Sequence, residues 1–106
     1  MRKDEFNIMG DIKLIEELKA QLICVIGEFF QLLTRGSNVA KDAVLECISS
    51  AMIILYLLGE KLGYSYLQID ENTKEKIRIG IVDEDNQENY GDALRKLHHH
   101  LKERRD

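Results

Sequence analysis

Between residues 11 and 36, apolar residues recur at alternating steps of three and four positions. The series consists of Ile15, Leu18, Leu22, Val25, Phe29 and Leu32. This spacing is typical of the buried face of a packed helix, and we expect Asp11 to cap its N-terminus and Gly36 to end it. A second apolar set consists of Ile23, Ile26, Phe30 and Leu33. Because this set widens the apolar surface beyond one face, the helix is expected to contact more than one neighbour.

A second long helix is predicted over residues 39–62, with its N-terminal cap at residues 37–38 (Ser-Asn) and its end at Gly63. Its middle, residues 51–58, is apolar on every side, and such a helix must be covered on every side. One partner helix in a chain of 106 residues cannot cover it. We therefore expect a homodimer or homotetramer that associates through the helix at residues 44–58.

Ser65 and Gln68 have the spacing of a capping box, which predicts a shorter helix that ends near Ile79, with Gly80 at its C-terminal end. The alternation of isoleucines within residues 77–81 is also typical of a short strand. We favour the helix because like charges recur four residues apart, as on a helical surface. These pairs are Glu71 with Glu75 and Lys74 with Arg78.

A last helix is predicted after an acidic connector at residues 83–86. Residues 85–88 repeat the capping-box spacing, and the helix that follows carries Leu94, Leu97 and Leu101. Together the four segments predict an all-α fold, a four-helix bundle with two long antiparallel helices and two shorter ones. The absence of proline from the sequence fits long uninterrupted helices.

The predicted helical domain spans residues 11–104, and residues 1–10 precede it as an extension whose order the sequence does not decide. A chain of 106 residues is enough for one domain. Its composition, 44% hydrophobic and 32% charged, is that of an ordinary globular protein.

Charge and hydropathy exclude two classes of partner. With 15 Lys and Arg against 19 Asp and Glu, the formal charge is −4, and the basic surface that nucleic-acid binding normally requires is missing. The most apolar stretch, residues 43–58, is interrupted by Glu46 and is shorter than the roughly 18–20 residues of a membrane span. We interpret it as a buried helix and expect no membrane association.

The two cysteines, Cys24 and Cys47, lie far apart in a sequence without a secretory signal. We expect reduced thiols in the cytoplasm, both packed as small hydrophobic side chains. The three histidines at 98–100 are consecutive, so on a helix they point about 100° apart and cannot bind one ion together. One of them is expected to pack beside the leucines of its helix and the others to face water.

Two carboxylates, Glu28 and Glu46, lie within otherwise apolar runs. In such a setting a carboxylate lies at a solvated edge, is ion-paired, or binds a metal. Mg²⁺ takes oxygen ligands and is commonly bound by a few carboxylates together with the phosphate oxygens of a substrate. The residues alone leave the structural and the metal-binding interpretations open.

Several segments, in their order and spacing, resemble the MazG-like family of all-α nucleoside triphosphate pyrophosphohydrolases. They are residues 26–33 (Ile-Gly-Glu-Phe-Phe-Gln-Leu-Leu), 35–36 (Arg-Gly), 42–46 (Asp-Ala-Val-Leu-Glu) and 55–65 (Leu-Tyr-Leu-Leu-Gly-Glu-Lys-Leu-Gly-Tyr-Ser). The resemblance extends over roughly residues 14–80. It implies a helical dimer or tetramer that cleaves a nucleoside triphosphate into monophosphate and pyrophosphate.

The resemblance also implies a set of site residues. Mg²⁺ or Mn²⁺ would be held by acidic residues of the first two core helices, which makes Glu28 and Glu46 the catalytic and metal-binding candidates. Basic residues after the second long helix contact the phosphates in this family, and Lys74, Lys76 and Arg78 occupy that region.

The first acidic motif of the family, Glu-Glu-x-x-Glu, is incomplete in this sequence. Its last position is Glu28, but its first two positions are Cys24 and Val25. Glu16 and Glu17 lie about two to three turns away, too far along one helix to replace them without a second subunit.

The second motif, Glu-x-x-Asp, also lacks a residue. Aligned through Glu46, its Asp position is Ser49; aligned one residue later, the pair becomes Cys47 and Ser50. In either register the Asp is missing, so Mg²⁺ affinity is expected to fall, and thiols would suit Zn²⁺ better.

Two functions therefore remain. The first is a divalent-metal-dependent nucleoside triphosphate pyrophosphohydrolase with weakened activity, in which Glu28 and Glu46 hold the ion. The second is a catalytically inactive helical module of the same fold, used for nucleotide binding or for protein assembly. The missing carboxylates favour the second, and the retention of Glu28 beside polar Ser49 and Ser50 favours a surviving pocket.

Overall fold

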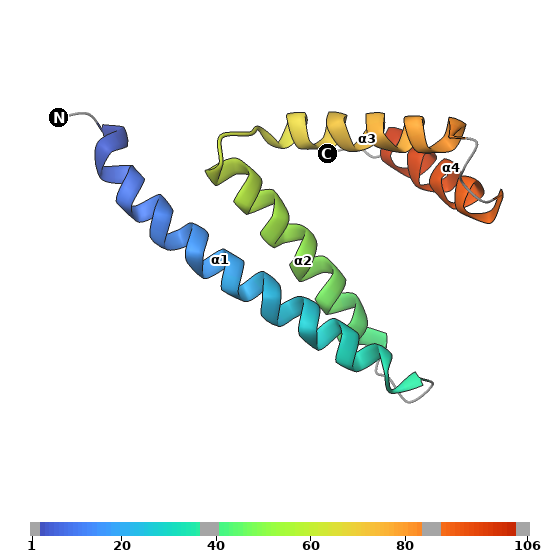
Figure 1. The fold of residues 1–106 in the computed structure, drawn as a ribbon, viewed down its shortest axis with the longest axis horizontal. Helices are drawn as coiled ribbons and strands as arrows, with labels where there is room; N and C mark the ends of the chain where they lie inside the picture. The colour runs from blue at the N-terminus through green and yellow to red at the C-terminus, as the bar shows by residue number, and fades with distance from the viewer. Residues whose placement is uncertain (1–2, 37–40, 84–87, 104–106) are drawn as a thin grey trace. The chain divides into compact units, whose positions relative to one another are not determined.

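The computed structural model of this chain describes residues 3–36, 41–83 and 88–103. Its helices are α1 (Lys3–Leu33), α2 (Lys41–Lys61), α3 (Tyr66–Val82) and α4 (Glu88–Glu103), and the described residues contain no strand (Figure 1). The predicted all-α class, with two long antiparallel helices followed by two shorter ones, is confirmed. The chain divides into two compact units, Met1–Tyr64 and Ser65–Asp106. In the first unit α1 packs against α2, and in the second α3 packs against α4.

Helix α1 begins earlier than the sequence predicted. It starts at Lys3 and continues through Gly10, so the expected N-terminal cap at Asp11 is wrong. No proline interrupts this segment, and one glycine inside a helix costs only about 1 kcal/mol. Asp11 instead lies within the helix, where its carboxylate is 3.7 Å from the ammonium group of Lys61 at the end of α2.

Both predicted glycine stops are confirmed. Gly36 follows the end of α1 with a φ of 60°, and Gly63 follows α2 with a φ of 104°. At the second stop, the Gly63 N–H donates to the Glu60 carbonyl and the Tyr64 N–H to the Gly59 carbonyl, both at 3.0 Å. This pair of bonds is the Schellman motif, which requires a left-handed residue at the position of Gly63. The cap predicted at residues 37–38 lies outside the described residues.

The core of the first hairpin is formed by the predicted apolar series of α1. All six of its members are buried or half-buried. Leu18 and Leu32 are the most buried, at 4% and 6% exposed, and on α2 the buried residues are Cys47 and Ile54, each 6% exposed. The second apolar set of α1 and much of the middle of α2 remain exposed within this hairpin. One partner helix thus covers one side of each helix, as expected.

Helix α2 is long and apolar enough to cross a membrane by length and composition alone. The helix has 21 residues, so the argument from the sequence that this apolar stretch is too short for a span is wrong. One such helix is weak evidence for a span, because the core helices of soluble proteins, which are mostly buried, pass the same test. Within the structure, 11% of its most apolar window is buried, so most of its surface needs a further covering.

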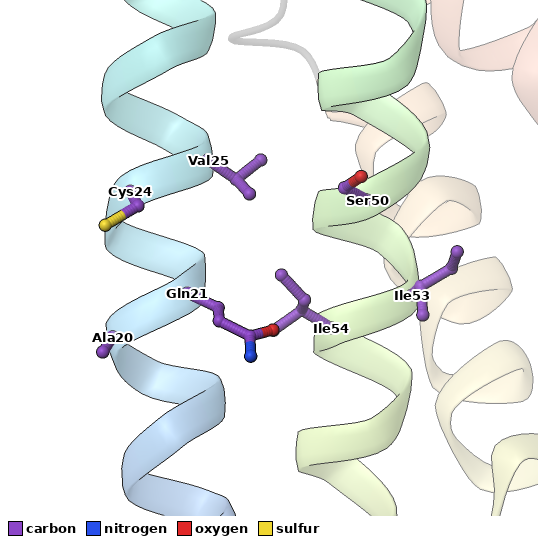
Figure 2. A pocket seen from close by; sticks show the side chains of 7 residues that line it. All are labelled: Ala20, Gln21, Cys24, Val25, Ser50, Ile53 and Ile54. Carbon is purple, nitrogen blue, oxygen red and sulfur yellow. The ribbon is translucent and has the colours of Figure 1, made fainter.

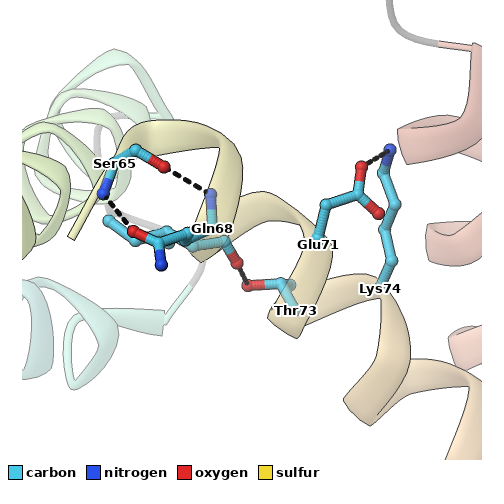
Figure 3. Close-up of polar contacts among 6 residues, drawn as sticks. Ser65, Gln68, Glu71, Thr73 and Lys74 are labelled. Atoms are coloured by element: carbon cyan, nitrogen blue, oxygen red, sulfur yellow. Dashed lines mark hydrogen bonds and ion pairs between the residues drawn. The ribbon is translucent and has the colours of Figure 1, made fainter.

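The predicted capping box at the start of α3 is confirmed (Figure 3). The Gln68 backbone N–H donates to the Ser65 hydroxyl at 3.0 Å, and the Ser65 backbone N–H donates to the Gln68 side-chain carbonyl at 2.8 Å. One turn further on, the Thr73 hydroxyl donates to the Ile69 carbonyl at 2.7 Å. The two bonds between Ser65 and Gln68 satisfy backbone donors that the start of a helix otherwise leaves without partners.

Ser65→Ala is expected to lower the free energy of unfolding by about 1 kcal/mol, because the Gln68 N–H loses its acceptor. Urea denaturation followed by circular dichroism measures the change. Ser49→Ala is the matched control, since Ser49 is exposed in the interior of α2 and alanine is the better helix former there. An equal loss in both variants would show that the Ser65 cap contributes nothing specific.

The second hairpin departs from prediction at the end of α3. Gly80 lies inside the helix, which continues to Val82 and has Asp83 as its C-cap, so the predicted end near Ile79 is wrong. The alternative of a strand over residues 77–81 is also wrong. Helical spacing buries Ile77, which is 6% exposed, while Ile79 is 54% exposed. The box predicted at residues 85–88 falls largely outside the described residues.

Candidate functional site

A shallow groove of about 470 Å³ runs between α1 and α2. It is lined by Ala20, Gln21, Cys24 and Val25 of α1 and by Ser50, Ile53 and Ile54 of α2. Figure 2 shows Val25 and Gln21 directed toward α2, whereas Cys24 is directed away from it. The groove contains both α1 positions at which the acidic motif departs from its pattern, Cys24 and Val25.

The groove lies on one defined side of the hairpin. Successive residues on a helix point about 100° apart, so a residue that immediately precedes an inward-facing position always points to the same side. Cys24 precedes half-buried Val25, and Ile53 precedes buried Ile54. Because α1 and α2 are antiparallel right-handed helices, the residues that come just before inward-facing residues lie on the same side of the hairpin in both helices. Glu28 and Glu46 precede inward-facing residues too, and therefore share this side.

The pKa of the Cys47 thiol is affected by burial and by the charges of both carboxylates. Burial raises the pKa of Cys47, and the negative charges of Glu28 and Glu46 raise it further. A thiol with a raised pKa stays protonated and is a poor nucleophile and a poor metal ligand. Cys47 is therefore a core residue, as predicted. Cys24 is exposed, so the prediction that both cysteines pack in the core is wrong for Cys24.

The structure distinguishes between the two registers of the second acidic motif. In the register through Glu46, both Glu46 and Ser49 are exposed. In the register one residue later, Cys47 is 6% exposed and Ser50 is half-buried in the groove. The residues that face α1 are thus Cys47 and Ser50, and neither supplies a carboxylate.

The residues present do not fit a divalent-metal centre. Among the described residues, no group of three or more His, Cys, Asp or Glu side chains is positioned to hold a metal ion. Glu28 and Glu46 are both exposed, and a pair of hydrated carboxylates supplies fewer protein ligands than the sites of this chemistry use. The positions that could complete the set hold Cys24, Val25 and Ser50.

The three predicted phosphate-contacting residues lie on α3, in the second hairpin. Two of them are already paired with carboxylates of their own helix. The ammonium group of Lys74 is 3.6 Å from Glu71. Arg78 donates two hydrogen bonds to Glu75, at 3.1 and 2.5 Å, and these bonds lower the pKa of Glu75.

Lys76 points to another side of α3. It lines a pocket between α3 and α4 together with Ile77, Tyr90 and Leu94. The three predicted cations therefore do not form one cluster.

The histidines behave as helical spacing predicts: His98 is half-buried, and His99 and His100 are exposed.

Sequence reasoning missed Gln21, which brings the only side-chain amide to the lining of the groove. It also missed the ion pair between Asp11 and Lys61. A contact between residues so far apart in the chain has no local signal in a single sequence.

A family model described as the MazG-like family matches residues 8–94. The match extends beyond both ends of the resemblance noted from the sequence. No curated protein sequence and no solved structure matches the chain.

Proposed function

Because this chain belongs to the MazG-like family, we propose that it is a helical assembly module of that family in which the divalent-metal centre has been lost. It is a cytoplasmic protein in this proposal, and it associates with further copies of itself through the first hairpin. In this proposal the chain has no metal-dependent activity that cleaves nucleoside triphosphates into monophosphate and pyrophosphate.

The observation that carries this proposal is the lining of the groove. At the acidic-motif positions, Cys24, Val25 and Ser50 line the groove, and Cys47 is buried in the hairpin. Phosphoryl chemistry depends on metal ions and cations that stabilise the charge of the reacting phosphates. A groove of neutral side chains, with its nearest carboxylates hydrated at the rim, lacks that machinery.

A second candidate function is the pyrophosphohydrolase itself, with Mg²⁺ or Mn²⁺ as cofactor and a nucleoside triphosphate as substrate. One observation favours it. Glu28 and Glu46 come from helices that pack against each other, and the negative charges of both raise the pKa of the Cys47 thiol. In this candidate, Lys74, Lys76 and Arg78 would contact the phosphates.

A pyrophosphate-release assay separates the two functions. We expect the wild-type chain, at high protein concentration with canonical and modified nucleoside triphosphates and Mg²⁺ or Mn²⁺, to release no more pyrophosphate than a protein-free blank. Glu28→Gln, which keeps the shape of the side chain and removes its charge, is expected to give the same result. Metal-dependent release by the wild type that is lost in Glu28→Gln would establish the hydrolase and overturn the assembly proposal.

A further inference from the structure

A shallow pocket of about 430 Å³ lies between α3 and α4 in the second hairpin. Its volume is within the range of about 300–1,000 Å³ that small-molecule sites occupy. The apolar part of its lining includes Ile77 of α3 and Leu94 and Leu97 of α4, and Ile77 is only 6% exposed. The proposed assembly function uses the first hairpin and leaves this pocket without a role.

Among the described residues, the one cation that lines this pocket is Lys76. In the same part of the chain its ammonium group forms no ion pair, whereas the neighbouring cations are paired, Lys74 with Glu71 (Figure 3) and Arg78 with Glu75. The positions three and four residues from Lys76 hold no carboxylate, so its own helix supplies no partner. The positive charge in the pocket is therefore available to an anion.

Gly80 leaves space beside Lys76. It lies four residues further along α3, one turn away on the same face of the helix, and it lines the same pocket. Glycine inside a helix is unfavourable relative to alanine, and at this position it adds no side chain to the pocket. A bound molecule can therefore lie against the backbone of α3 with its anionic group beside Lys76.

Tyr90 of α4 adds an aromatic ring to the lining. It is 56% exposed, so its ring is accessible to a ligand. Aromatic rings pair in offset-stacked or edge-to-face arrangements, and such pairs gain more than the burial of their area alone. The ring of Tyr90 therefore favours a ligand with a flat aromatic body over one with an aliphatic chain.

The charges of the pocket favour a carboxylate over a phosphate. Asp83 also lines the pocket, seven residues after Lys76 and thus about two turns further along α3. A phosphate monoester carries a charge of about −1.5 to −2 at pH 7, and the chain itself has a net charge of −4. One ammonium group that shares a pocket with an aspartate is complementary to a single negative charge.

We propose that the pocket between α3 and α4 binds a small aromatic monocarboxylate, whose carboxylate pairs with Lys76 and whose ring contacts Tyr90. This site goes beyond the proposed assembly function and does not depend on it, because the pocket and the groove belong to different hairpins. The ligand occupies the space that Gly80 leaves open.

Three probes with one ring system test the class of ligand in isothermal titration calorimetry of the full chain at about pH 7. We expect naphthoate to bind with a dissociation constant below about 1 mM. Naphthol has no charge at this pH, and naphthyl phosphate carries up to about two negative charges. Each is expected to bind at least about tenfold more weakly. Naphthol that binds as tightly as naphthoate, or naphthyl phosphate that binds more tightly, would overturn the proposal.

Lys76→Met tests the position of the carboxylate, with Lys96→Met as its matched control. Lys96 is an exposed lysine of α4 that lies two residues from half-buried Leu94 and His98, and it therefore points away from α3. We expect Lys76→Met to weaken the binding of naphthoate by about tenfold or more, because a hydrogen bond between charged groups is lost. Lys96→Met is expected to leave the dissociation constant within about twofold of the wild-type value.

Two substitutions at Tyr90 test the aromatic contact. Tyr90→Leu is expected to weaken the binding of naphthoate by about threefold or more, and Tyr90→Phe, which keeps the ring, to leave it within about twofold. Equal weakening by Lys76→Met and Lys96→Met would overturn the inference. So would amide chemical-shift changes confined to α1 and α2 when naphthoate is added, or no binding of naphthoate at about 1 mM.

Discussion

Ile54→Ala is expected to lower the free energy of unfolding by about 2–5 kcal/mol, because it removes three methyl or methylene carbons from a packed interior and leaves a cavity. Ile54 is 6% exposed and packs between α1 and α2. A domain of this size is stable by only about 5–15 kcal/mol in total. Among the described residues of the hairpin, the buried apolar side chains are Leu18, Leu32, Cys47 and Ile54. With so small a core, the truncation of one of them is expected to destabilise the whole unit. Urea denaturation at fixed protein concentration measures it.

Ile53→Ala is the matched control for this prediction. The two residues are identical in type and adjacent in α2, but Ile53 is 57% exposed on the groove side. We expect its truncation to cost less than about 1 kcal/mol. If both variants lost the same stability, the side of α2 that faces α1 would be assigned incorrectly, and with it the side of the hairpin on which the groove lies.

The long helices could be predicted because their signals are local and redundant. Six residues of α1 repeat the helical period, and all of them face α2. The ends of α1 and α2 are marked by Gly36 and Gly63, where a left-handed backbone favours glycine. The cap of α3 depends only on Ser65 and Gln68, three residues apart. No knowledge of distant contacts is needed for any of these features.

Features that depend on distant contacts could not be predicted. Asp11 has the residue type of an N-terminal cap, but it lies inside α1 and pairs with Lys61. The two cysteines are equivalent by sequence, and only the packing of α1 on α2 makes Cys47 buried and Cys24 exposed. Gly80 resembles a helix stop, yet α3 continues for two residues beyond it.

The candidate site was harder to predict than the helices, because a shift of one residue in the alignment of the acidic motif changes which side chains face α1. Sequence spacing left two registers for the second acidic motif and could not rank them. A shift of one residue turns a side chain by about 100° around the helix. This turn separates exposed Ser49 from Ser50, which lines the groove. The choice of register therefore needed the position of α1.

The register in which Cys47 and Ser50 face α1 predicts that a metal site can be restored in the groove. We expect the double variant Val25→Glu with Ser50→Asp to bind Mn²⁺ at least tenfold more tightly than the wild-type chain, as measured by isothermal titration calorimetry. The two introduced carboxylates lie on facing helices, and the first is three residues before Glu28, on the same side of α1. Three carboxylates from two helices provide the oxygen ligands that Mn²⁺ and Mg²⁺ prefer.

The control double variant is Val25→Glu with Ser49→Asp. It has the same composition, the same charge and the same substitution at half-buried position 25, but its second carboxylate replaces Ser49, which is exposed and does not line the groove. We expect it to bind Mn²⁺ no better than Val25→Glu alone. Tighter binding by this control than by the groove variant would mean that the register through Glu46 faces α1. Glu46 would then regain its place as a metal ligand, and the hydrolase would become the better-supported function.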